Sequence, residues 1–227
     1  MIKTIQGGVP VSRTELADPV LMDAINKYSK LDLPFAPTLW LEFHGTEHSV
    51  AEQAKMVQAI ASEHGGADFS WTTKPEDRGR LWRARHDVAY ADKALREGGQ
   101  LRVTDVCVPI SRLAECITET QKDLAASFLP APIVGHAGDG NFHVCFVLNP
   151  SDPREMAEAE RLNEQVVHRA LIARRHLHRR ARYRLRQDRL FDCRARRCYE
   201  RYACDQEGDR PRQHYESGKN SPDLNRW

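Results

Sequence analysis

The chain has 227 residues, with 34 lysines and arginines against 32 aspartates and glutamates, a formal net charge of +2. This length suffices for one large domain or two small ones. No stretch approaches the roughly 18 consecutive apolar residues of a membrane span, and the first ten residues lack the apolar core of a signal peptide. We therefore expect a soluble protein without a membrane span.

The charge is unevenly distributed along the chain. Residues 1–172 carry 18 basic and 24 acidic side chains, whereas residues 173–227 carry 16 basic and 8 acidic ones. The near-neutral sum therefore combines an acidic body with a basic tail.

Hydrophobic spacing in the body predicts alternating strands and helices. Residues 1–35 contain three prolines and one short helical pattern at 20–30, and we interpret them as a lead-in segment. Strands are expected at 38–44, 68–71 and 101–108, and helices at 48–64, 75–95, from 111 to before Pro130, and from 151 to 171.

This order predicts an α+β fold: one mostly antiparallel sheet with helices packed on one face, in the ferredoxin-like style. The expected organisation is a lead-in segment at 1–35, a domain at 36–172 and an irregular or disordered tail at 173–227.

The most informative stretch is GHAGDGNFHVCFVLNP, residues 135–150. It places His136 and His143 on either side of a Gly-Asp-Gly turn, between two runs of strand-forming residues. Opposed residues on paired strands carry Cβ atoms roughly 4.5–5.5 Å apart, so two imidazoles there can share one metal ion. A third ligand, usually a carboxylate, would come from elsewhere. The alternative is that both histidines are ordinary polar surface residues.

The run HAGDGNFH resembles the His-x-Gly-Asp-Gly-Asn-x-His signature of flavin-linked D-2-hydroxyacid dehydrogenases, in the C-terminal domain of the FAD-linked oxidase family. Four further runs carry the resemblance, which covers about residues 10–172: SKLDLPFAPT, PTLWLEFHGTE, FSW with LWRARH, and VTDVCVPISRL. The similarity is greatest to the C-terminal part of FAD-dependent D-lactate dehydrogenases that pass electrons to cytochrome c or a quinone.

The resemblance implies a flavoprotein oxidoreductase that oxidises D-lactate to pyruvate by hydride transfer to FAD, most of which a separate N-terminal domain binds. Glycolate or D-2-hydroxyglutarate is the alternative substrate within the family. By the same resemblance, His136 and His143 match two ligands of a divalent metal, zinc or manganese, and Arg85 matches an arginine that binds the substrate carboxylate. Taken alone, Arg85 fits a salt bridge on a helix surface, and Asn141 fits a role in the turn.

The resemblance also bears on compartment. Family members occur in mitochondria and in bacteria, so it implies a mitochondrial protein in a eukaryote and a cytoplasmic or peripheral inner-membrane protein in a bacterium.

The basic tail has two interpretations. Its 14 arginines between residues 174 and 212 are typical of a disordered arm that binds nucleic acid. Alternatively, codons permitted for Arg174 onward, read one base later, encode a string with GEHG and NPGK runs that resembles the family's closing segment.

We favour the frameshift and expect no nucleic-acid partner. The shifted frame would put the family's metal-binding glutamate and catalytic histidine at the positions of Arg180 and Ala181. Without them, we expect this chain to be an inactive fragment of the dehydrogenase.

Overall fold

The computed structural model describes the backbone of residues 1–180 and the side chains of residues 1–173. The predictions made for the rest of the basic tail, including the frameshift and the nucleic-acid alternative, lie outside the described residues. Within residues 1–180, no helix is both long enough and apolar enough to cross a bilayer.

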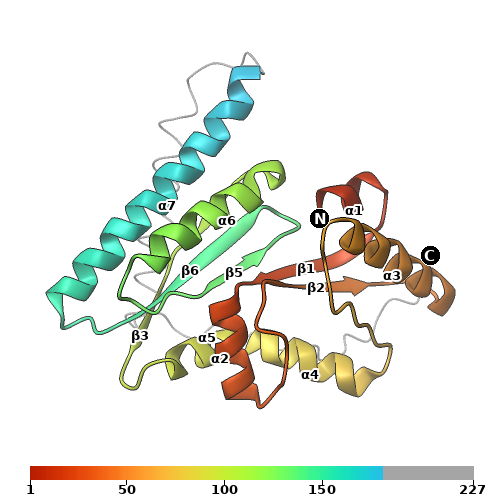
Figure 1. Cartoon of the computed structure of the whole chain (residues 1–227), viewed down its shortest axis with the longest axis horizontal. Helices are drawn as coiled ribbons and strands as arrows, with labels where there is room; N and C mark the ends of the chain where they lie inside the picture. Colours follow the sequence, from red (N-terminus) through yellow and green to blue (C-terminus); the bar gives the residue numbers. More distant parts are fainter. Residues whose placement is uncertain (181–227) are drawn as a thin grey trace, which may run out of the picture. The chain divides into compact units, whose positions relative to one another are not determined.

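One antiparallel sheet organises the described chain (Figure 1). Its strands run in the order β2-β1-β5-β6-β3, and the short β4 also pairs with β6. The bounds are β1 Val11–Ala17, β2 Thr38–Phe43, β3 Gln100–Val103, β4 Val106–Cys107, β5 Ile133–His136 and β6 Asn141–Leu148.

The helices that accompany the sheet are α1 Ile2–Gln6, α2 Pro19–Ser29, α3 Glu47–Glu63, α4 Pro75–His86, α5 Val88–Ala94, α6 Ile110–Ala125 and α7 Pro153–Arg180. Local capping explains two of the starts. The Asp18 carboxylate accepts a hydrogen bond from the Leu21 amide, with Pro19 in the first turn, and the Thr46 hydroxyl accepts one from the Ser49 amide.

Helices cover both faces of the sheet. On one face, α6 and α7 pack on β5 and β6 and form the first core, which includes Ile133, Val144 and Phe146. On the other face, α2, α4 and α5 form the second core with Val134 and Cys145. Figure 1 shows α6 and α7 lying along β5 and β6, away from α2 and α5.

The predicted α+β class and antiparallel sheet are confirmed, but the helices are not confined to one face. The reason is that β5 and β6 carry apolar side chains on both faces of the sheet. Val144, for example, packs in the first core, and the next residue, Cys145, packs in the second. Two apolar faces of one sheet both need cover.

The lead-in interpretation of residues 1–35 needs correction, and so does the domain start at residue 36. Strand β1 lies between β2 and β5 in the sheet, and α2 contributes Leu21, Met22 and Ile25 to the second core with no exposed surface. These residues belong to the fold itself.

Several predicted elements agree with the structure and others do not. The strand at 38–44 and the helices at 48–64 and 151–171 are confirmed as β2, α3 and α7. No strand forms at 68–71, where Asp68 has φ +53°. The predicted helix at 75–95 is two helices that meet at Asp87, and the predicted strand at 101–108 is β3 and β4.

Candidate active site

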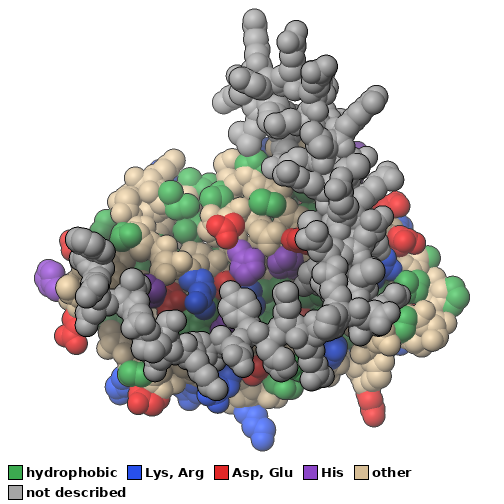
Figure 2. Space-filling model, turned by 180° about the vertical axis from the view of Figure 1, so that it is seen from behind, with side chains coloured by type: hydrophobic (Ala, Val, Ile, Leu, Met, Phe, Trp, Pro, Cys, Tyr) green, Lys and Arg blue, Asp and Glu red, His purple; other side chains and the backbone are tan. Residues whose placement is uncertain are grey.

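A group of polar side chains lies on the sheet face that also carries the second core. It consists of Glu15 from β1, Arg85 from α4, His136 from β5 and His143 from β6, and we call it the polar cluster. Figure 2 shows histidine side chains together near the middle of the visible face, next to basic and acidic side chains. Four separate elements therefore meet at this place.

The β5–β6 hairpin brings the two histidines together. In the strand register His136 lies opposite Asn141 and His143 lies opposite Val134, so both imidazoles project from the same face. Their ring centroids are 5.7 Å apart, with the ring planes at 85°. The predicted proximity is confirmed, although the two residues are diagonal neighbours rather than directly opposed.

The turn of this hairpin depends on Gly140. Its φ is +72°, and a Cβ atom there would collide with the carbonyl oxygen of Val108, whose own amide donates to the Gly140 carbonyl at 2.8 Å. The Asn141 side chain donates to Asp105 Oδ1 at 2.8 Å and to the Val106 carbonyl at 3.2 Å. These contacts fix the turn against residues 105–108, which include β4, and this agrees with the turn role predicted for Asn141.

His143 is held by the backbone. Its Nδ1 lies 2.9 Å from the carbonyl oxygen of Thr104, which can only accept, so Nδ1 carries the proton. Burial lowers the pKa of His143, which favours the neutral ring. The Asp105 carboxylate is 3.6 Å from the same nitrogen. Nε2 of His143 therefore presents a lone pair.

His136 is held by a side chain instead. Its Nδ1 lies 3.1 Å from Oε1 and 2.9 Å from Oε2 of Glu15, the residue opposite it in the β1–β5 register. A carboxylate accepts hydrogen bonds, so the proton again sits on Nδ1. Both histidines thus direct Nε2 away from their anchors, and in the neutral form of each ring this atom carries the lone pair.

Arg85 reaches the same carboxylate from α4. Its Nη2 donates to Glu15 Oε2 at 2.8 Å, and its side chain is 15% exposed. The Nε atom of Arg85 is buried without a hydrogen-bond partner. The salt bridge on a helix surface, which Arg85 fits when taken alone, is not what the structure has: Arg85 forms a largely buried ion pair to the sheet.

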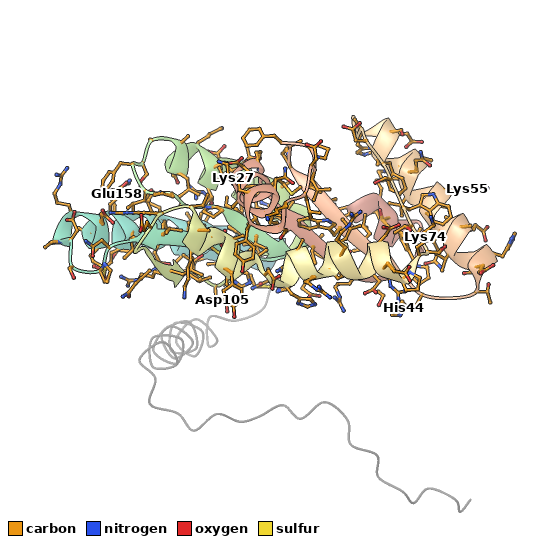
Figure 3. All side chains as sticks on the ribbon, turned by 90° about the horizontal axis from the view of Figure 1, so that it is seen from below. Lys27, His44, Lys55, Lys74, Asp105 and Glu158 are labelled. Carbon is orange, nitrogen blue, oxygen red and sulfur yellow. The ribbon has the colours of Figure 1, made fainter. Side chains whose placement is uncertain are left out.

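The row of polar residues continues towards β2. The guanidinium carbon of Arg13 lies 4.3 Å from the centre of the Trp82 ring, and its Nε is 3.5 Å from Glu42. Figure 3 shows Asp105 and His44 on the side of the sheet where α4 lies. This side of the sheet therefore carries acidic, basic and imidazole groups along several strands.

The residues present fit part of a metal site. An imidazole that binds a metal typically donates its other ring nitrogen to a carboxylate or a carbonyl, which is the arrangement of both His136 and His143. Within the part of the chain that the structure describes, however, no three His, Cys, Asp or Glu side chains are grouped closely enough to hold a metal. The two histidines thus form an incomplete donor set, and the side chain at position 180 lies outside the described residues.

Two contributors to this site were missed by the sequence prediction. Glu15 lies in β1, which alternates poorly because polar Thr14 and Glu15 occupy buried positions. Thr104 acts through its backbone carbonyl, which no sequence pattern reveals. Only the position of Glu15 opposite His136 shows its role.

Comparison with known proteins shows which family the chain belongs to. The family described as "FAD linked oxidases, C-terminal domain" matches residues 1–174. The chain belongs to this family. The match includes β1 and α2, as expected from their place in the sheet and core.

Among curated relatives, the domain is 45% identical over 170 residues to "Probable D-lactate dehydrogenase, mitochondrial" of Danio rerio, covering 75% of this chain and 34% of the relative. It is 46% identical over 170 residues to "D-lactate dehydrogenase [cytochrome], mitochondrial" of Arabidopsis thaliana, covering 75% and 30%. It is 25% identical over 166 residues to "Glycolate oxidase subunit GlcD" of Bacillus subtilis, covering 72% and 34%. The chain thus spans about a third of the length of these relatives.

Proposed function

We propose that this domain is the substrate-holding part of an FAD-dependent dehydrogenase that oxidises D-lactate to pyruvate. The observation that carries the proposal is the meeting of Arg85 and His136 on one carboxylate, with His143 beside them. A small 2-hydroxy acid has two adjacent polar ends, a carboxylate and a hydroxyl, and the polar cluster offers a different kind of group for each.

The carboxylate end suits Arg85. A guanidinium carries five N–H donors in a plane, and Glu15 accepts from only one of them in the described contacts. The remaining donors match the two oxygens of a carboxylate. The charges of Arg85 and Glu15 cancel. A divalent cation bound at the two histidines would therefore strengthen the attraction of an anionic substrate.

The hydroxyl end suits the two histidines. Their Nε2 atoms would hold a divalent cation, zinc or manganese, which when bound lowers the pKa of the substrate hydroxyl. In the overall reaction the hydroxyl proton leaves to a base, and the C2 hydrogen leaves with two electrons to FAD. His136 and His143 contribute orientation, since both rings are fixed at Nδ1.

The relatives favour D-lactate over other hydroxy acids. Identity is 45–46% to the two D-lactate dehydrogenases and 25% to the glycolate oxidase subunit. Glycolate and D-2-hydroxyglutarate are the second choice. We also propose cytochrome c as the electron acceptor, with a quinone as the alternative that the family resemblance implies, and a mitochondrial location in a eukaryote. The names of the two D-lactate dehydrogenases support a cytochrome as acceptor and a mitochondrial location.

Binding by the full 227-residue chain tests this proposal. Calorimetric titration is expected to show zinc or manganese binding that His136→Ala and His143→Ala each abolish, and His44→Ala leaves unchanged. His44 is the matched control because it is an exposed histidine on the same side of the sheet.

With the metal present, D-lactate is expected to bind more tightly than L-lactate, glycolate or D-2-hydroxyglutarate. Arg85→Met should weaken D-lactate binding without preventing metal binding. Equal D-lactate binding by the wild type and by Arg85→Met would refute the role given to Arg85.

We further propose that the 227-residue chain, assayed alone, does not turn over D-lactate. The described residues provide two metal-binding imidazoles without a third side chain to complete the site. Dye reduction that depends on D-lactate, measured with added FAD and zinc or manganese, should stay at background. Sustained turnover by the purified chain would contradict this expectation.

A further inference from the structure

We propose that Glu15 is a positioning residue that sets the orientation of both substrate-binding groups at once. It fixes the tautomer of His136 that leaves Nε2 free, and it holds the guanidinium of Arg85 next to that ring. The inference rests on the proposed function, because it assigns to Glu15 a role in the same site.

The position of Glu15 is determined by the sheet rather than by a flexible loop. It lies near the middle of β1 and faces His136 directly across the β1–β5 ladder, with 6% of the residue exposed. Strand pairing on both sides of β1 holds the backbone at this point, because β2 pairs with its other edge. The carboxylate therefore meets His136 at a separation that the strand register fixes.

The two contacts of the carboxylate share one oxygen. Glu15 Oε2 lies 2.8 Å from Arg85 Nη2 and 2.9 Å from His136 Nδ1, and Oε1 lies 3.1 Å from the same Nδ1. A charged acceptor makes shorter and stronger hydrogen bonds than a neutral one. One side chain thus links a strand residue and a helix residue that are 51 positions apart in the sequence.

His143 provides the internal comparison. Its Nδ1 is held by the Thr104 carbonyl, a backbone group that no substitution removes. Replacing Glu15 should therefore release His136 and leave His143 in place. A general loosening of the fold would disturb both rings.

A purely structural role for Glu15 is the competing explanation, in which the ion pair only anchors α4 to the sheet. The pair of Glu155 with Arg96 offers a matched control, since Glu155 is 7% exposed and accepts from Arg96 Nη1 at 2.6 Å. Glu155 also accepts from the Asn149 amide, and neither partner belongs to the polar cluster. Both glutamates are buried ion-pair acceptors, but only one touches a histidine.

The first experiment reads the His136 tautomer directly. Nitrogen NMR of the metal-free 227-residue chain, at about pH 8, where free histidine is neutral, distinguishes a proton on Nδ1 from one on Nε2. The wild type is expected to carry it on Nδ1 at both histidines. In Glu15→Ala, His136 should shift towards the Nε2 tautomer that free histidine prefers, while His143 keeps its proton on Nδ1. Glu155→Gln should change neither ring.

The second experiment measures zinc affinity of the same variants. Loss of a group that orients a metal-binding histidine typically costs roughly 10–100-fold in affinity, and we expect a loss in that range for Glu15→Ala. Arg85→Met retains the Glu15 contact to His136 and should change zinc affinity little, as should Glu155→Gln. If Arg85→Met lowers affinity as much as Glu15→Ala does, the effect passes through the ion pair and the positioning role is wrong.

The two experiments separate this inference from the proposed function. A wild-type chain that binds no zinc would overturn the metal site, while the NMR measurement would still decide the role of Glu15. A wild-type His136 with its proton on Nε2, or a tautomer unchanged in Glu15→Ala, would overturn the positioning role whether or not zinc binds. If Glu15→Ala does not fold, the tautomer of His136 in the wild type and the zinc affinity of Arg85→Met decide whether Glu15 has the positioning role.

Discussion

The two faces of the sheet share strands β5 and β6 but differ in what they carry. The face under α6 and α7 is apolar along the whole of β6, where Phe142, Val144, Phe146 and Leu148 are all at most 2% exposed. The opposite face begins as a core around Cys145 and changes into the polar cluster at His143 and His136. Strands β5 and β6 therefore bury apolar side chains on one face and carry the polar cluster on the other.

The difference shows how a polar site is supported in a small domain. Charged groups such as Glu15 and Arg85 are costly to bury and contribute little net stability. The apolar face supplies the burial that keeps the strands in register. The histidines can therefore face the site, because the alternate residues of β6 face the opposite side and pack in the first core.

Phe146 should give the largest loss of stability. Phe146→Ala removes an aromatic side chain that is 1% exposed in the first core, and the expected loss in the free energy of unfolding is about 3–5 kcal/mol. Guanidinium unfolding followed by circular dichroism measures it. Leu171→Ala, on an α7 residue that is 40% exposed, is the control and should stay within about 0.5 kcal/mol. A loss below about 1 kcal/mol at Phe146 would mean that the apolar face is not the main support.

The pH dependence of stability at Asp92, a buried residue of α5, tests the opposite face of the sheet. Asp92 has no exposed surface, and the Cys145 thiol lies beside it without good hydrogen-bond geometry to either carboxylate oxygen. Burial raises the pKa of Asp92 to about 7. The folded state then keeps a proton that the unfolded state releases near pH 4, so the free energy of unfolding should fall as the pH rises from about 4 to about 7.

Each pKa unit corresponds to about 1.4 kcal/mol, so this fall approaches about 4 kcal/mol. Denaturation of wild type and Asp92→Asn across this pH range isolates the contribution, since other groups titrate in both proteins. The wild type should lose stability relative to the variant up to about pH 7 and then level off. A difference that stays flat, or that rises with pH, would show that Asp92 is ionised inside the fold.

A substitution at Gly140 tests the turn that connects β5 to β6. Gly140→Ala forces a side chain into a positive φ and against the Val108 carbonyl, and we expect a loss of roughly 2–3 kcal/mol. Gly138→Ala is the matched control in the same turn, because its Cβ would meet only Thr14 at 3.9 Å. Thermal denaturation of the pair measures the difference. Equal melting temperatures would contradict the importance assigned to the approach of Val108.

His136 should show the smallest effect on stability. Its side chain is 44% exposed, and in His136→Ala the Glu15 carboxylate keeps its bond to Arg85, so we expect a change of about 1 kcal/mol or less. The same variant is expected to abolish metal binding. Chemical denaturation alongside zinc titration compares the two effects. A large loss of stability would place His136 with the structural residues rather than with the site.

The elements that could be predicted from the sequence are those defined by local patterns. The β5–β6 hairpin, α2, α3 and β2 follow from apolar periodicity and turn residues close to the observed bounds. The break between α4 and α5 could not be found this way, because Asp87 ends one helix and starts the next within an unbroken helical pattern. Strand β1 was missed since its buried positions include polar residues.

The sequence by itself determined the pairing of His136 with His143, because both lie in one hairpin whose turn chemistry is local. It also determined the family, through runs of residues spread over the body. Only the tertiary structure decided that Glu15 joins His136 to Arg85, since these residues come from three elements far apart in the chain. Register across a sheet and the docking of a helix onto it depend on packing of the whole domain, and no local pattern contains them.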